Sequence, residues 1–247
     1  LVKVGYRDTV NGIDMGTGTL TLTGDNTYSG GTNVQAGKVL LNADSALGTG
    51  KATFAKDTEL SLDVNKKVLL DTGVTKGLSV ANAIQVNGEV DVHTGSLDSS
   101  LTGKIEGAGS LVKDGTGQLS LTGANSYTGG TTINAGKVAL GANTSLGIGK
   151  DSKATFTNNT ELSLGITKGL SVDNNVQLDG AVKVHNGTFD SVLNGVISGV
   201  GSLVKDGKDN KDGGKEADTG ILTLTGINTY EGGTIVNDGT LAISQNA

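Results

Sequence analysis

The sequence predicts an all-β protein that winds as a right-handed parallel β-helix, or β-solenoid. Apolar and polar residues alternate along most of the chain, as in Glu59–Val64 and Ala181–His185, and this period of two is typical of half-buried strands. Gly, Asn or Asp separates the short strands, and no stretch has a sustained helical period. Without helices to cross over, short strands can pair in parallel if the chain coils and stacks.

A threefold internal repeat supports the same fold class. The sequence TGQLSLTGANSYTGGTTINAGKVAL at Thr116–Leu140 has close copies at Thr17–Leu41 and Thr219–Ile243. The sequence between the copies also recurs, because Thr75–Ser99 parallels Thr167–Ser191. We therefore predict a single β-helix over residues 1–247, with internal repeats that start near residues 17, 116 and 219.

The repeats differ by insertions around 65–73 and 208–218, while the strand sequences stay the same. Variable corners between constant strands are typical of a solenoid, in which insertions leave the stack as loops. A coil of roughly 20–25 residues predicts about ten to twelve rungs. We expect Val, Leu and Ile to face inward, and Thr, Ser, Lys and Asp to face the solvent. Since neither end shows a capping sequence, we expect a fragment of a longer rod.

Within the repeated motif, a strand is followed by a glycine turn, a tyrosine and a Gly-Gly bend. We interpret the three tyrosines as plugs at equivalent edges of the core, because three ligand-stacking sites one repeat apart would form an unusual binding surface. The predicted structural motif consists of Tyr28, Gly30, Gly31, Tyr127, Gly129, Gly130, Tyr230, Gly232 and Gly233.

Composition argues against several functions. The net charge is -6 and Arg7 is the sole arginine, whereas nucleic-acid binders concentrate basic residues. Cysteine is absent, which excludes thiol catalysis and thiolate metal sites, and no apolar run approaches the ~20 residues that span a membrane. His93 and His185 occupy equivalent repeat positions and are interpreted as turn residues at strand ends.

We assign no catalytic residue, metal ligand or cofactor. No GxSxG nucleophile motif is present, which disfavours a serine protease. A glycan-degrading β-helix is the remaining enzymatic alternative. Such sites need clustered carboxylates and aromatic platforms, and this chain has no Trp and few other aromatic residues.

Recognition is expected where the copies differ, because loops on a rigid scaffold commonly carry binding. The insert at Lys208–Asp218 fails the spacing of an EF-hand calcium loop, since Lys211 stands where an oxygen ligand is required. The candidate partner-binding residues in the two inserts are Asn65, Lys66, Lys67, Lys208, Asp212, Lys215 and Glu216.

The triplicated pattern LxLTGxNxYxGGT resembles the passenger-associated transport repeat of bacterial autotransporters, the type V secretion system. This resemblance implies a β-helical passenger that is exported across the outer membrane of a Gram-negative bacterium and then displayed or secreted. It covers Thr17–Leu41, Thr116–Leu140 and Thr219–Ile243. In that family these repeats are linked to secretion and folding, so the motif itself implies no activity.

We therefore expect a monomeric, non-enzymatic adhesin or virulence effector that binds a host-cell surface protein, matrix or glycan. We expect no nucleic-acid partner, and we expect that the chain itself does not span the membrane. The alternative is a structural stalk that presents another domain.

Overall fold

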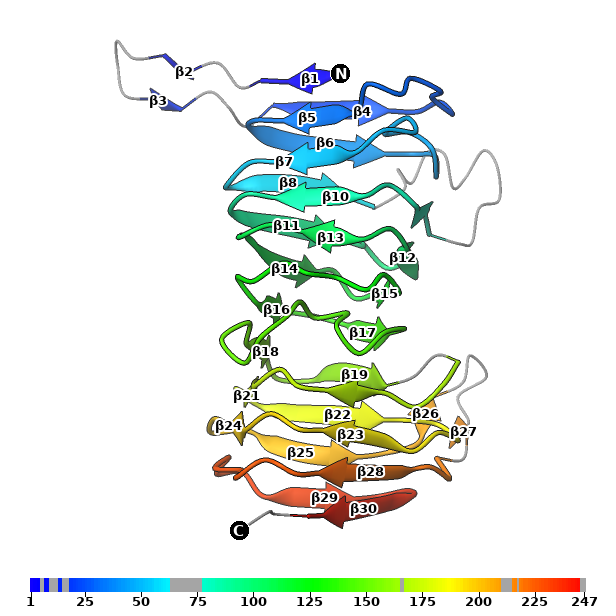
Figure 1. The fold of residues 1–247 in the computed structure, drawn as a ribbon, viewed down its shortest axis with the longest axis vertical. Coiled ribbons are helices and arrows are strands. Elements are labelled where there is room, and N and C mark those ends of the chain that lie inside the picture. Colours follow the sequence, from blue (N-terminus) through cyan, green and yellow to red (C-terminus); the bar gives the residue numbers. More distant parts are fainter. Residues whose placement is uncertain are drawn as a thin grey trace.

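The computed structural model describes residues 1–4, 18–62, 77–164, 167–207 and 218–244, together with the backbone of four short strands outside these ranges. Every regular element in this part of the chain is a strand, and the strands stack as coils of a rod with the two termini at opposite ends (Figure 1). The structure has about nine turns, and the longest sheet has nine strands. These observations confirm the predicted all-β, parallel β-solenoid.

Three faces run along the rod, and each is built from parallel strands. One face carries a nine-stranded sheet in which neighbouring strands come from successive coils. In spatial order from the N-terminal end, it comprises β4 (Thr19–Leu22), β6 (Gly37–Leu41), β8 (Thr58–Ser61), β11 (Glu89–His93), β14 (Ser110–Asp114), β16 (Thr131–Ile133), β18 (Ala154–Phe156), β21 (Val176–Leu178) and β24 (Ile197–Ser198).

The second face carries an eight-stranded sheet. It comprises β9 (Ser79–Val80), β12 (Ser99–Leu101), β15 (Gln118–Leu121), β17 (Lys137–Leu140), β19 (Thr160–Leu164), β22 (Ala181–His185), β25 (Ser202–Lys205) and β29 (Thr234–Val236).

The third face carries two sheets, which are separated by the coils that contain Tyr127. The first has five strands: β1 (Val2–Lys3), β5 (Thr32–Val34), β7 (Ala52–Phe54), β10 (Ile84–Val86) and β13 (Ile105–Glu106). The second has four: β20 (Ser171–Val172), β23 (Ser191–Leu193), β28 (Ile221–Leu224) and β30 (Thr240–Ile243).

Two antiparallel strand pairs complete the described elements. They are β2 (Arg7–Asp8) with β3 (Ile13–Asp14), and β26 (Lys208–Asp209) with β27 (Lys215–Glu216).

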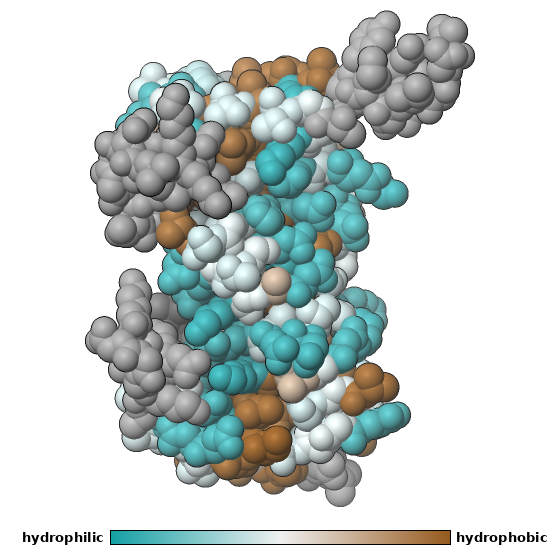
Figure 2. Space-filling model, turned by 180° about the vertical axis from the view of Figure 1, so that it is seen from behind, coloured by the Kyte–Doolittle hydropathy of each residue, from teal (hydrophilic) through white to brown (hydrophobic). Residues whose placement is uncertain are grey.

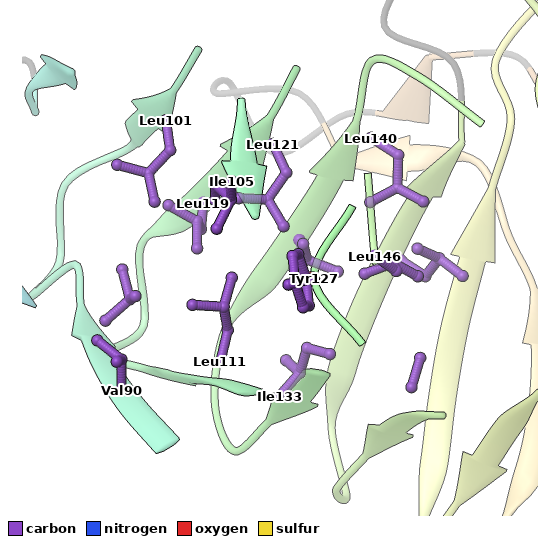
Figure 3. Close-up of a cluster of buried hydrophobic side chains, with 14 of the residues drawn as sticks. Val90, Leu101, Ile105, Leu111, Leu119, Leu121, Tyr127, Ile133, Leu140 and Leu146 are labelled. Carbon is purple, nitrogen blue, oxygen red and sulfur yellow. The ribbon is translucent and has the colours of Figure 1, made fainter. Parts of the chain in front are cut away.

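The core is a set of apolar columns that run along the rod axis. Because neighbouring strands are parallel and in register, Leu121 lies beside Leu140, and Leu140 lies beside Leu164. All three side chains are fully buried, as the alternating pattern predicts. Figure 3 shows the same arrangement around Tyr127, where Leu111, Ile133 and Leu146 point into one cluster.

The rod has about nine turns, fewer than the ten to twelve expected, although its described coils have the expected length. On the nine-stranded sheet, β14, β16, β18, β21 and β24 begin at residues 110, 131, 154, 176 and 197, which is 21 to 23 residues apart. The coil with the strandless corner between Leu140 and Ala154 is among them. The estimate was too high because it divided the whole chain, inserts included, into coils.

Over one repeat, the chain makes four full turns and then advances to the next face of the rod. β14 and β25 carry the same repeated sequence, Ser-Leu-Val-Lys, yet β14 belongs to the nine-stranded sheet and β25 to the eight-stranded sheet. Between them the chain returns to the nine-stranded sheet four times, in β16, β18, β21 and β24. Equivalent residues of successive repeats therefore point to different sides of the rod.

Candidate functional site

The repeated motif forms a clamp between successive coils. In the second copy, the Tyr127 hydroxyl lies 2.5 Å from Thr131 Oγ1 and donates to the carbonyl of Ser145 at 3.3 Å. Asn125 accepts from the backbone N–H of Ile105 in the preceding coil, and its amide donates to the Ser145 carbonyl in the following coil. The motif thus connects three levels of the stack.

The first copy makes equivalent bonds to the coil that follows it. Asn26 donates to the carbonyl of Ala46 at 2.7 Å, and Tyr28 lies 2.7 Å from Thr32 Oγ1. In the third copy, Tyr230 bonds to Thr234. Tyr127 is fully buried, while Tyr28 and Tyr230, at the two ends of the rod, are half-buried. Burial raises the pKa of Tyr127 well above its usual range.

The Gly-Gly pair allows close approach on both sides of the motif. A Cβ on Gly129 would lie 2.6 Å from the backbone of Gly109 in the preceding coil. Gly130 has a φ of +88°, and a Cβ there would lie 2.6 Å from the carbonyl oxygen of Lys153 in the following coil. The first glycine therefore contacts the coil before and the second contacts the coil after, so neither position has room for a side chain.

One expectation about the lysines is wrong. Lys113 and Lys205 are fully buried, although we expected lysines to face the solvent. Alternation along the strand predicts the burial of Lys113, because Lys113 lies two residues after the inward-facing Leu111. The expectation was wrong because it placed lysines outside on polarity alone. Lys113 Nζ donates to the carbonyl oxygens of Gly115 at 2.7 Å and Ala135 at 3.0 Å.

These lysines hold the corner before the next strand of the motif. Lys3 donates to the carbonyl of Ala36, the position equivalent to Ala135, at 3.1 Å. Lys205 contacts the equivalent carbonyl of Asp238 and forms a buried ion pair with Asp218 at 2.5 Å. Burial lowers the pKa of Lys113 to about 8, against the opposing effect of the Asp114 and Asp98 carboxylates.

The outward faces between the motifs differ in charge between the repeats. From the end of the first repeat to the start of the second, five carboxylates lie on or beside neighbouring strands β8, β11 and β14 of the nine-stranded sheet. We call this set the acidic strip: Asp57, Glu59, Glu89, Asp91 and Asp114. Glu59 lies directly beside Asp91 in the parallel register, so two like charges stand on neighbouring strands, whose backbones are about 4.8 Å apart.

The carboxylates of the acidic strip change the pKa of Asp91, which lies among them. Burial raises the pKa of Asp91 above its usual range, and the nearby carboxylates of Asp114, Glu89, Glu59 and Asp57 raise it further. Lys38 pairs with Glu59 at 2.7 Å at the edge of the strip. The strip is therefore a concentrated negative surface, which favours a cationic partner.

The second repeat replaces this strip with a mixed and more buried cluster. Lys183 stands in place of Asp91, and the residues equivalent to Asp57 and Glu89 are Asn159 and Ala181. Glu161, the counterpart of Glu59, is 6% exposed and pairs with Lys137 at 2.9 Å.

His185 departs from the prediction that it is a turn residue. It lies at the end of β22, is 3% exposed and bonds to Glu161 through Nε2. Burial raises the pKa of Glu161, but hydrogen bonds from His185 and Lys137 outweigh it and lower that pKa to about 2. His93 occupies the equivalent position at the end of β11 and is only half-buried, so repeat equivalence did not predict this difference.

The predicted partner-binding residues fall in the inserts. Asn65, Lys66, Lys67 and Asp212 lie outside the described residues. Lys208 lies on β26, while Lys215 and Glu216 lie on β27, which pairs with it antiparallel. Their binding role stays a prediction.

A hollow of about 360 Å³ lies beside the first repeat's corner. Asp44, Ser79 and Asn82 are among its lining residues. Asp44 already accepts from the backbone N–H of Ser79, and Asn82 donates to the carbonyls of Gly48 and Gly50. These polar side chains therefore support the corner itself.

No group of three or more His, Cys, Asp or Glu side chains with the geometry of a metal site occurs among the residues that the structure describes. Within the same residues, no helix has the length and apolar character to cross a membrane.

Comparison with known proteins places the motif in a family. The passenger-associated-transport-repeat family matches residues 15–41, 111–140 and 217–243, which are the three motif copies. A curated relative, an adhesin BmaC autotransporter from Brucella suis biovar 1 (strain 1330), is 36% identical over 124 residues, or 49% of this chain. The chain spans 4% of that protein's length. No solved structure matches.

The three matched segments are the motif copies that clamp successive coils of the parallel β-solenoid. Both comparisons support an autotransporter passenger, a class of protein that is displayed on, or secreted from, the surface of Gram-negative bacteria.

Proposed function

We propose that this chain is part of an autotransporter passenger that acts as an adhesin and binds a host-cell surface protein, matrix component or glycan without catalysing a reaction. The observation that carries the proposal is the 36% identity to part of a protein named an adhesin. In this proposal residues 1–247 form one monomeric β-solenoid unit. The motif copies hold the stack together, and recognition belongs to the faces where the repeats differ.

The acidic strip is the contact surface that we favour on the described part of the chain. Three of its carboxylates, Asp57, Glu89 and Asp91, have no acidic counterpart in the second repeat, and the extra face per repeat turns the mixed counterpart to another side of the rod. A ligand that requires dense negative charge would therefore contact one side at one level. Basic segments of a host protein have the complementary charge.

Binding of the purified chain to host cells, matrix proteins and a glycan array tests the adhesin proposal. Saturable binding that heat-unfolded protein lacks is the expected result. Absence of saturable binding on all three surfaces contradicts the proposal.

Two charge variants test the acidic strip. Asp91→Lys introduces the residue that the second repeat carries, and Asp151→Lys makes the same charge change at an exposed corner outside the strip. Asp91→Lys is expected to weaken binding by about tenfold and to reduce its salt dependence, with little effect of Asp151→Lys. Equal effects of the two variants would place the contact elsewhere.

A structural stalk is the second candidate function. The observation that favours it is the near-identical set of motif contacts in the first two copies, since such contacts serve stacking. Replacing the segment in its parent protein with an unrelated β-solenoid of equal length discriminates between the two functions. Full retention of adhesion supports the stalk, and loss of adhesion supports direct binding.

A further inference from the structure

Lys205 and Asp218 form the most deeply buried ion pair that the structure describes. Nζ of Lys205 lies 2.5 Å from Oδ2 of Asp218, and both side chains are 0% exposed. On the side that Figure 2 shows, much of the surface between the ends of the rod is hydrophilic, and such a surface is where lysine and aspartate ordinarily lie. Two opposite charges without access to solvent lose the hydration of both ions, and their mutual attraction does not always restore that loss.

The carboxylate of Asp218 is only half satisfied. Its Oδ2 accepts from Lys205 and from the backbone N–H of Asn186, the latter at 3.1 Å. Its Oδ1 is buried and has no hydrogen-bond partner among the described residues. Buried carboxylate oxygens normally have partners, because an unpaired one loses its hydration without compensation. An ionised Asp218 is therefore poorly accommodated at this site.

The equivalent lysine of the second copy has no carboxylate partner. Nζ of Lys113 donates to four other oxygens: Thr94 Oγ1 and the carbonyls of Asp114, Gly115 and Ala135. Asp218 is the last residue of the insert that the second copy lacks. A carboxylate therefore reaches the buried lysine in the third copy and not in the second.

Both members of the pair are held in place by neighbouring coils. The backbone N–H of Asp218 donates to Oδ2 of Asp238 at 3.0 Å, and Lys205 Nζ also contacts the Asp238 carbonyl at 3.3 Å. Asn186 fixes the carboxylate from the other side. Groups that are held against each other in this way react with effective molarities on the order of 10⁵–10⁸ M when the orientation is right.

We propose that Lys205 and Asp218 condense to an isopeptide bond, so that this pair is a site of self-modification. A proton first passes from the ammonium to the carboxylate, which leaves a neutral amine and a neutral carboxylic acid. The Nζ lone pair then attacks Cγ of Asp218, and the new N–C bond forms. The bond from Cγ to Oδ1 breaks, and Oδ1 leaves as water with two protons of the original ammonium group. The third proton stays on the amide nitrogen.

The product removes both difficulties of the buried pair. Two buried charges become one neutral amide, and the unpartnered Oδ1 leaves as water. Oδ2 becomes the amide oxygen and keeps its bond from the N–H of Asn186, which also faces the negative charge that develops on this oxygen during the attack. The bond closes residues 205–218 into a covalent ring at the base of the insert. A cut within the insert would therefore leave the two parts of the chain joined.

Mass spectrometry of the denatured chain tests the proposal. The wild type is expected to weigh less than its sequence by the mass of one water molecule. Trypsin does not cleave after an acylated lysine, so the digest should contain a branched peptide that joins residues 184–208 to residues 216–247. A mass equal to that of the sequence, with separate peptides that end at Lys205 and begin at Glu216, overturns the proposal.

Three variants locate the loss of water. Lys205→Arg keeps the positive charge but cannot form this amide, and Asp218→Ala removes the carboxylate, so both are expected to have the full sequence mass. Lys113→Arg makes the matched change at the equivalent buried lysine and is expected to keep the loss of water. A loss that persists in Lys205→Arg and Asp218→Ala would place it elsewhere, for example in a succinimide at Asp206-Gly207, and would overturn the proposal. The branched peptide is sought in the wild type, so the test does not depend on the folding of a variant.

Discussion

At the scale of single residues, the interior of this rod is less apolar than its sequence pattern predicts. Lys113 and Lys205 lie among the stacked aliphatic columns, and Glu161 with His185 lies just beneath an outer face. Each group has hydrogen-bonding or charged partners, as buried polar groups require. These contacts make stability depend on pH.

Glu161→Gln is expected to reduce the loss of unfolding free energy that the wild type shows as the pH becomes acidic. The pKa of Glu161 is lowered to about 2 in the folded chain, so its contribution is present above its usual pKa and is lost as the pH falls from about 4.5 towards 2. In urea titrations, the free energy of unfolding of the wild type should fall by on the order of 2–3 kcal/mol more than that of the variant across this pH window. Glu59→Gln, at the half-buried equivalent position, is the control and should show a much smaller difference.

Lys113→Met is expected to remove an increase in stability at alkaline pH. Burial lowers the pKa of Lys113 to about 8, below its usual value, so the unfolded chain binds more protons between about pH 8 and 10. Stability of the wild type should therefore rise by on the order of 1–2 kcal/mol from pH 7.5 to 9.5, relative to the variant. The exposed Lys153→Met serves as control, and a pH response identical to that of Lys113→Met would refute this account.

At the scale of one element, the Gly-Gly bend shows how local sequence encodes contacts to other coils. Gly30 and Gly129 occupy the same motif position. A Cβ on Gly129 would meet the preceding coil, whereas Gly30 has nothing within 4 Å. The cost of a side chain thus depends on the neighbouring coil as well as on the bend.

Gly129→Ala is expected to destabilise the protein by about 2–3 kcal/mol, because the backbone of Gly109 would have to shift. Gly30→Ala is expected to change stability by less than about 0.5 kcal/mol. Thermal unfolding of both variants measures the difference. A similar loss in the two proteins would show that the bend conformation, rather than the neighbouring coil, requires glycine.

At the scale of the whole molecule, the rod is a one-dimensional stack in which each coil contacts its neighbours. Because each repeat makes four turns and then advances by one further face, Tyr28, Tyr127 and Tyr230 lie on three different sides of the rod. A face of the rod therefore presents different repeat positions at each level. This arrangement lets near-identical repeats produce non-identical surfaces.

Amide hydrogen exchange is expected to be slowest in the central coils and fastest at both ends. β15 and β17 have paired neighbours on both edges, while β1, β4, β29 and β30 have one paired edge each among the described strands. Interior coils therefore need more of the stack to open before they exchange. Uniform protection along the rod would indicate instead that it unfolds as one cooperative unit.

Much of the fold follows from local sequence. Period-two alternation, glycine punctuation and the threefold repeat were sufficient to predict the strands, their parallel stacking and the match to the transport-repeat family, because each signal lies within a few residues or recurs along the chain. The three tyrosines were also recognisable as equivalent positions.

Folding in three dimensions decided the features that depend on contacts between coils. The burial of Lys113, the pairing of Glu161 with His185 and the side of the rod on which each repeat faces all depend on the residue that lies one coil away. That neighbour is about 20 residues distant in sequence, at a spacing that corner lengths change. Local pattern cannot set that spacing, so the stacked structure was needed to find the acidic strip.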